Sequence, residues 1–312
     1  MTPPQRALTG CLINLSISES EDSPERGFPR SQVNRTTLQV VAALFGQGAS
    51  VIFGHDWRED GIMEAVYGFA RQVQAPIPLS SSEAAADAQP LLWNLLPWPD
   101  SPYLPERDLE QLSSTLRVEL AGLPKELQAV DGEARRVGPA DGLYQYVRAR
   151  GLTFQRHRLN TVSHVRFCLG GRVSGYAGRY PGVIEEAFLA VREKKPLYLA
   201  GFLGGATKQV VDAIEGKQMT DDFCGPTPVQ GLYEVPAVKE SDGTTHDDRV
   251  IDRVAVWKAF AGAGRERIAA TNGLTVEENG ELFHTPVIDR AIELVLIGLS
   301  RLKPNLLEHK LN

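Results

Sequence analysis

Apolar and polar positions along the first quarter of the chain follow the order strand, helix, strand, helix. Residues 7–17 and 49–56 are short apolar runs bounded by polar residues, which is typical of buried strands. Residues 33–48 and 60–76 place apolar side chains at helical spacing, and each stretch ends on glycine or proline. This β-α-β-α order predicts a parallel sheet that is covered by helices.

The same alternation resumes in the middle of the chain. It predicts a strand at 164–171, a helix at 183–195, a strand at 196–203 and a helix at 206–216. Between the two halves, residues 90–97 contain a short apolar strand, and residues 106–150 look charged and partly helical. The fold class expected from these elements is α/β: a Rossmann-like doubly wound parallel sheet with helices on both faces, elaborated by an insertion and a C-terminal helical extension.

The C-terminal part is predicted to be helical at 252–264 and 286–302, after a loop-like stretch at 218–250. The helix at 286–302 carries Ile288, Ile292, Val295, Ile297 and Leu299, which is more apolar surface than one exposed helix should carry. Packing against the core explains this surface, and a homo-oligomer interface is the alternative.

Composition narrows the class of protein. The net charge of −6 argues against generic nucleic-acid binding, which needs an excess of Lys and Arg. The three cysteines are widely spaced and suggest buried thiols in a reducing cytoplasm. No signal peptide and no membrane span is recognisable, and no histidine pair has metal-ligand spacing. We therefore expect a cytoplasmic protein without a metal, a cofactor or a membrane partner.

The most informative stretch is LGGRVSGYAGRYPGVIEEAFLAV, residues 169–191, between a predicted strand and a predicted helix. Ligands of open α/β sheets bind beyond the carboxyl ends of strands, where glycines allow close backbone approach and helix N-termini suit phosphate. The alternative is that the glycines only shape a long turn. The residues of this stretch that we expect to bind a phosphate-bearing ligand are Gly170, Gly171, Arg172, Gly178, Arg179, Gly182 and Val183.

Two acids, Glu185 and Glu186, begin the helix that follows this turn. Acids in a first turn stabilise a helix by themselves. Because adjacent helical residues point about 100° apart, only one of the two can face a ligand well. In a functional interpretation, that carboxylate binds ribose hydroxyls or stabilises positive charge near an anomeric carbon during glycosidic cleavage.

YPGVIEEA, following a strand that ends in CLGG, is similar to the PGGxGTxxE signature of the SLOG superfamily. That group includes the Lonely Guy phosphoribohydrolases, lysine decarboxylase-like and DprA-like proteins, and sensor domains of antiphage effectors and TRPM channels. LINLSIS and VIFGHDWREDGIMEAVYGFA resemble further family elements. The resemblance covers about 8–75 and 155–215 and implies a Rossmann-like sheet with a nucleotide pocket. The whole chain, 1–312, is then one elaborated domain with an insertion at about 80–150 and a C-terminal extension at about 250–312.

The resemblance also implies site residues. Ser16 and Ser18 would lie at the tip of the first strand, and Gly54-His55 would replace a second Gly-Gly. The hydrolases of the family carry an arginine upstream of the glycine loop. Arg156 and Arg158 are both candidates for it, and we take Arg158 as the catalytic partner of the two acids. Val183 stands where the family has a threonine, which favours binding over cleavage.

Asn34 and Arg35 precede the first long helix and follow a long Ser/Pro-rich loop, so they are candidates for contact with a phosphate at the N-terminus of that helix. Three functions remain open at this point. The first is a sensor that binds a nucleotide or an NAD- or ADP-ribose-type signal without turnover. The second is an N-glycosidase acting on nucleoside 5′-monophosphates, and the third is a structural partner with a vestigial pocket.

Overall fold

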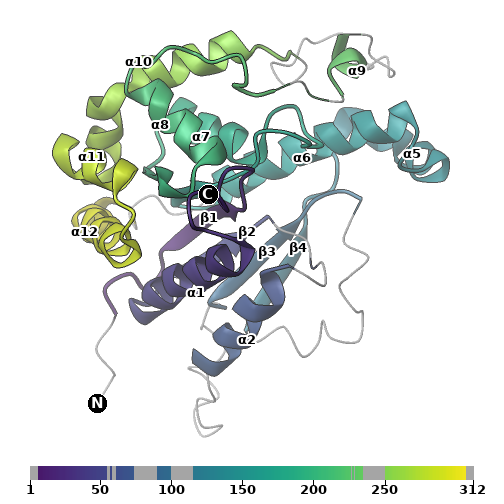
Figure 1. Cartoon of the computed structure of the whole chain (residues 1–312). Helices are drawn as coiled ribbons and strands as arrows, with labels where there is room; N and C mark the ends of the chain where they lie inside the picture. Colours follow the sequence, from purple (N-terminus) through teal and green to yellow (C-terminus); the bar gives the residue numbers. More distant parts are fainter. Residues whose placement is uncertain are drawn as a thin grey trace, which may run out of the picture.

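The computed structural model describes residues 6–54, 57, 61–73, 90–99, 115–225, 227, 229–234 and 250–306. Across these ranges, six parallel strands form one sheet in the order β4-β3-β2-β1-β5-β6 (Figure 1). The strands are β1 (Leu12–Ser18), β2 (Ser50–Phe53), β3 (Leu92–Leu96), β4 (Leu116–Leu120), β5 (Val165–Gly170) and β6 (Leu197–Ala200).

Helices connect and surround these strands. In chain order they are α1 (Arg30–Gly46), α2 (Met63–Val73), α5 (Asp131–Val137), α6 (Gly142–Val162), α7 (Gly182–Arg192), α8 (Gly205–Ile214), α9 (Gln230–Glu234), α10 (Arg253–Asn272), α11 (Val276–His284) and α12 (Ile288–Leu306). Short 3₁₀ helices occur at Lys125–Val130 and Gly201–Leu203.

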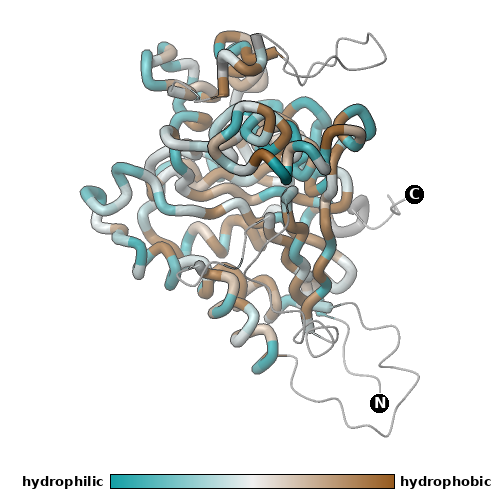
Figure 2. The backbone as a smooth tube through the Cα atoms, turned by 90° about the vertical axis from the view of Figure 1, so that its right-hand side faces the viewer, coloured by the Kyte–Doolittle hydropathy of each residue, from teal (hydrophilic) through white to brown (hydrophobic). Residues whose placement is uncertain are grey.

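The two faces of the sheet are covered by different helices (Figure 1). On one face, Ile13, Leu15 and Ile17 of β1 pack in a core with buried residues of α1, α2 and α12. On the other face, Leu197 and Leu199 of β6 pack with buried residues of α7, α8 and α10. The doubly wound α/β class expected from the sequence is therefore confirmed. Figure 2 shows hydrophobic segments running through the interior of the molecule, as two-sided burial of a parallel sheet requires.

The part of the expected insertion that the structure describes contributes to the same sheet. β3 confirms the short apolar strand expected at 90–97, and β4 adds an edge strand that the sequence analysis did not predict. In β4, Arg117 and Glu119 alternate with apolar residues, which is the pattern of a strand exposed on one side. α6 runs unbroken through residues 150–155, so one helix connects the insertion to the second half of the core.

The C-terminal region is helical, as expected, and packs on the sheet. α10 extends beyond the expected 252–264 and contains a kink at Gly264, while α11 was not predicted. α12 confirms the helix expected at 286–302, and its buried side chains join the core beside α1. Core packing thus accounts for much of its apolar surface, and the homo-oligomer stays a prediction. Across the described ranges, no helix is both long enough and apolar enough to cross a membrane.

Candidate functional site

The strand order reverses between β1 and β5. β2, β3 and β4 lie on one side of β1, whereas β5 and β6 lie on its other side, so the chain reverses direction across the sheet at this point. Ser18 and Gly170, the last residues of β1 and β5, are paired in the register. In open α/β sheets, ligands bind at the carboxyl ends of the strands at such a reversal. The glycine-rich turn begins there, as the sequence analysis expected.

Polar side chains line the face of β1 and β5 that lies beneath α6 and α7. Asn14 and Ser16 of β1 are paired in register with Arg166 and Cys168 of β5, so all four share one face. All four are buried. Within the described part of the chain, Asn14 Nδ2 and Arg166 Nε and Nη2 have no hydrogen-bond partner. A buried donor without an acceptor is costly, so these nitrogens can accommodate an acceptor such as water.

Glu186 connects this polar face to α7. Its carboxylate accepts hydrogen bonds from Ser16 Oγ and from Arg166 Nη1, the latter at 2.6 Å. The side chain of Arg166 is 0% exposed, and that of Glu186 is 15% exposed. Sequence reasoning did not single out Arg166. The available signal was an arginine inside the otherwise apolar strand HVRFCLGG, because a buried charge requires a partner.

Glu185 is buried more deeply than its neighbour and faces α6. One carboxylate oxygen accepts a hydrogen bond from Thr153 Oγ1 at 2.7 Å, and the other pairs with Arg156. Its side chain is only 2% exposed. The two adjacent acids therefore meet different partners, as expected from their angular separation on a helix. Of the two, Glu186 is the one that keeps some solvent contact.

The arginine beside the acids is Arg156, and the choice of Arg158 is corrected. Arg158 Nη1 donates to the carbonyls of Leu120 and Ala121, and its Nη2 pairs with Glu119 at 3.3 Å. Arg158 also lines a small hollow between α6 and strands β3 and β4. The physical reason is helical periodicity, because residues two apart on α6 point in nearly opposite directions.

Gly170 and Gly171 allow close packing at the end of β5. Both have positive φ, and a Cβ at Gly170 would lie 2.3 Å from the Ser18 carbonyl oxygen. A Cβ at Gly171 would lie 2.6 Å from Cγ2 of Val183, which is itself buried. The two glycines thus bring β1, β5 and the start of α7 together, which is a structural reason for their presence besides the expected ligand contact.

Gly178 and Gly182 pack against Arg156. A Cβ at Gly178 would lie 2.7 Å from Arg156 Nη1, and a Cβ at Gly182 would lie 3.1 Å from its Nη2. Thr227 covers the turn from outside and donates to the Gly178 carbonyl at 3.2 Å. The guanidinium of Arg156 therefore fills the space beneath the turn and holds Glu185 there.

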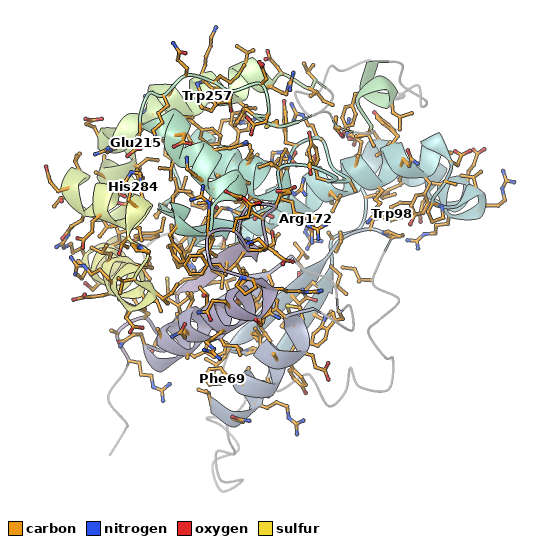
Figure 3. The ribbon with its side chains drawn as sticks, viewed as in Figure 1. Phe69, Trp98, Arg172, Glu215, Trp257 and His284 are labelled. Carbon is orange, nitrogen blue, oxygen red and sulfur yellow. The ribbon has the colours of Figure 1, made fainter. Side chains whose placement is uncertain are left out.

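The two arginines of the turn differ in environment. Arg179 is 7% exposed, its Nε donates to the Val250 carbonyl at 2.7 Å, and its guanidinium lies 4.9 Å from the Tyr180 ring centroid. Arg172 is exposed (Figure 3). Arg179 thus connects the turn to the start of the C-terminal region, while Arg172 lies at the surface, and its contact with a ligand stays a prediction.

The other expected ligand-binding residues lie around the same edge or outside the described ranges. Ser18 is half-buried at the end of β1. Asn34 and Arg35 were expected to precede the first long helix, but α1 begins at Arg30, so they lie inside its second turn, with Arg35 exposed. The Gly54 carbonyl accepts a hydrogen bond from Gln155 Nε2 at 3.0 Å, so α6 packs tightly on the end of β2. His55 lies outside the residues that the structure describes.

Acidic residues of the loop between β1 and α1 also reach this edge. The Glu21 carboxylate accepts hydrogen bonds from the main-chain N–H groups of Val173 and Ser174, and Asp22 accepts one from Gly205 N. Burial opposes ionisation of both acids, yet the hydrogen bonds outweigh it and lower both pKa values. Sequence reasoning noted the length of this loop but not its acids, although the run ESED follows the strand directly.

At Cys168 in β5, burial prevails over the other influences on the pKa. It raises the pKa of the Cys168 thiol to about 12, although the nearby Arg166 lowers it. The thiol therefore stays protonated near neutral pH and is a packing residue rather than a nucleophile. Cys11, Cys168 and Cys224 are all buried and form no disulfide, which confirms the expectation of buried thiols.

A family model described as SLOG cluster2 matches residues 7–282 of this 312-residue chain. The match runs from just before β1 into α11, so it includes the segments 80–150 and 218–250 that lay outside the resemblance seen in the sequence. The comparisons with curated proteins and with solved structures found no match.

Proposed function

Because this chain belongs to the SLOG cluster2 family, whose members are nucleotide-binding Rossmannoid domains, we propose that it binds a nucleotide or an NAD- or ADP-ribose-type ligand without cleaving it. The ligand lies at the carboxyl ends of β1 and β5, over the glycine-rich turn. Exposed Arg172 and the first-turn N–H groups of α7 supply positive charge for its phosphates. The protein then acts as a sensor of a nucleotide signal.

The observation that carries this proposal is that both acids are already neutralised by arginines. Glu185 pairs with Arg156 and accepts from Thr153, while Glu186 accepts from Arg166 and Ser16. Cleavage of an N-glycosidic bond needs a carboxylate that can activate water or stabilise developing positive charge at the anomeric carbon. Carboxylates engaged by buried partners are suited to holding α7 in place rather than to this chemistry.

The alternative is a nucleoside 5′-monophosphate phosphoribohydrolase that uses Glu186 with an arginine. The partial exposure of the Glu186 side chain favours this alternative, because it is 15% exposed whereas that of Glu185 is 2% exposed. In this reaction Glu186 would face the ribose, and Arg156, 4.0 Å from Glu186 Oε1, would replace Arg158 as its basic partner.

One experiment separates binding from cleavage. The full chain is incubated with each nucleoside 5′-monophosphate and with NAD, and released base is measured by chromatography. Binding of ADP-ribose and of the same nucleotides is measured in parallel by calorimetry. We expect binding without base release. Release of base that is lost in Glu186→Gln, and kept in the distant surface variant Glu281→Gln, would overturn sensing and establish the N-glycosidase. Absence of any nucleotide binding would contradict both and leave a structural partner domain.

A cytoplasmic location, a homo-oligomer and a role in antiphage defence belong to the same proposal and rest on the sequence. The observation that bears on the homo-oligomer is that Ile292, Leu296 and Ile297 of α12 are only partly buried. Light scattering of the full chain tests the oligomer, and a monomer at micromolar concentration would contradict it.

A further inference from the structure

The loop between β1 and α1, residues 19–29, crosses the carboxyl edge of the sheet and is called the strap below. Most connections from a strand to a helix in α/β proteins have about 2–6 residues, so this one is long. It reaches two other connections at the same edge, namely the glycine-rich turn after β5 and the turn that begins α8 after β6. Its contacts there are made by acidic side chains.

The first contact joins the strap to the glycine-rich turn. The Glu21 carboxylate accepts from Val173 N at 3.1 Å, from Ser174 N at 2.9 Å and from Ser174 Oγ at 2.7 Å. Two consecutive main-chain N–H groups and a hydroxyl thus converge on one oxyanion. Such concave groups of N–H donors are a known kind of anion site in proteins.

The second contact joins the strap to the start of α8. Asp22 Oδ1 accepts from Gly205 N at 2.9 Å, and the carboxylate also pairs with Arg26 at 2.6 Å. A Cβ at Gly204 would lie 2.4 Å from both carboxylate oxygens, so this approach requires glycine. The N-terminus of a helix carries a partial positive charge and favours an anion. A phosphate would use the same donors.

The strap is held mainly by these polar contacts. Between Ser20 and Phe28, Asp22 is half-buried, Ser23 is buried, and Glu21 and the other residues are exposed. Its two ends are fixed by Ser20 Oγ, which donates to the Leu203 carbonyl at 2.8 Å, and by Phe28, which packs 5.2 Å from the Phe202 ring centroid. The segment between these ends buries only the small side chain of Ser23, so it can leave the edge without removing a large apolar side chain from the core.

From this arrangement we infer that Glu21 and Asp22 occupy two oxyanion subsites of the nucleotide site, and that a ligand with linked phosphates displaces the strap by replacing both carboxylates. The inference rests on the proposed function and names the ligand class as a diphosphate-containing nucleotide derivative. In the absence of such a ligand, the carboxylates of the strap occupy the two subsites and keep the site closed. Binding then converts the presence of a diphosphate into movement of residues 21–27.

The first test measures competition between the strap and an anion, with inorganic pyrophosphate as the probe. Calorimetry compares the wild type with Glu21→Gln/Asp22→Asn and with the control Glu19→Gln/Glu25→Gln, which removes the same charge from the same strap. In the first variant the strap loses its charge-assisted hydrogen bonds to the amides and competes less strongly. Its affinity for pyrophosphate should therefore rise by about tenfold or more. The control should gain much less. Equal gains in both variants, or no pyrophosphate binding by any of the proteins, would overturn the inference.

The second test follows the strap itself through tryptic cleavage after Arg26, which is exposed within it. Pyrophosphate should accelerate this cleavage in the wild type, and Glu21→Gln/Asp22→Asn should be cleaved rapidly without any ligand. Protection of Arg26 by pyrophosphate, or an unchanged rate, would overturn displacement. If ADP-ribose binds all variants equally, the proposed function stands and the strap inference fails. If pyrophosphate displaces the strap but no nucleotide binds, the proposed function fails and the displacement of the strap by an anion stands.

Discussion

Arg156 of α6 and Glu185 of α7 form an ion pair beneath the glycine-rich turn, with side chains that are 9% and 2% exposed. Removing one partner of a buried pair leaves an uncompensated charge, which typically costs about 3–5 kcal/mol. Glu185→Ala should therefore lower the free energy of unfolding by about that amount in urea titrations. Glu293→Ala, which breaks an exposed pair with Arg290, should lower it far less. Equal effects of the two substitutions would show that the buried pair does not stabilise the fold.

The glycines at the end of β5 give a prediction with a matched control. Gly170 and Gly175 both have φ of +60°, but a Cβ at Gly170 would lie 2.3 Å from a carbonyl oxygen, whereas none of the described atoms lies within 4 Å of one at Gly175. Gly175→Ala should cost only the backbone strain of about 1–2 kcal/mol. Gly170→Ala should cost about 1–3 kcal/mol more because of the clash. Urea denaturation of both variants measures the difference, and equal losses would contradict the close packing of β1 and β5.

Thiol reactivity tests the burial of the cysteines. Burial raises the pKa of Cys168 to about 12 and also raises the pKa of Cys224, so neither is ionised near neutral pH. Because the thiolate is the reactive form, iodoacetamide at pH 8 should label these residues very slowly in the folded protein. Mass spectrometry after unfolding should show three labels per chain, one for each cysteine. Rapid labelling of the native protein at Cys168 would contradict the packing of β5 against α7.

The strap should respond to acid. The pKa values of Glu21 and Asp22 are lowered below their ordinary values of 4.5 and 3.8, since hydrogen bonds from Ser174, Arg26 and main-chain amides outweigh burial. A carboxyl with a lowered pKa contributes stability that is fully present above its ordinary pKa and is lost as the pH falls through the lowered value. The stability difference between the wild type and Glu21→Gln/Asp22→Asn should thus shrink as the pH falls below 4.5. Urea titrations from pH 7 to pH 3 measure it.

The acid prediction has the same matched control as the anion competition. The difference between the wild type and Glu19→Gln/Glu25→Gln should change much less over this range, because these two acids lie outside the contacts with residues 173–174 and 205. A difference for Glu21→Gln/Asp22→Asn that stays constant down to pH 3 would mean that the two carboxylates do not bind the amides in their ionised form.

Periodicity predicted the elements that are buried on a regular pattern and missed those that are not. The core strands β1, β2, β5 and β6 are mostly apolar, with buried exceptions such as Asn14, Ser16 and Arg166, and α1, α7 and α8 have apolar residues at helical spacing, so each was expected near its observed range. β4 is an edge strand with alternating charge. α6 buries Arg150, Gln155, Arg156 and Asn160, so its hydrophobic pattern is weak. Tertiary contacts make these polar residues acceptable in the interior.

The sequence by itself determined the doubly wound sheet, the position of the glycine-rich turn at a strand end, and the family. It determined them because two-sided burial and helical amphipathicity produce local patterns of apolar residues that can be recognised in the sequence. Only the tertiary structure decided that Arg156 rather than Arg158 contacts the acids and that Arg166 pairs with Glu186. It also decided that Glu21 and Asp22 accept hydrogen bonds from main-chain amides. These pairings join residues 20 to 183 positions apart. The partner of each residue depends on the direction of its side chain at the sheet edge, and the spacing of residues in the sequence does not predict that direction.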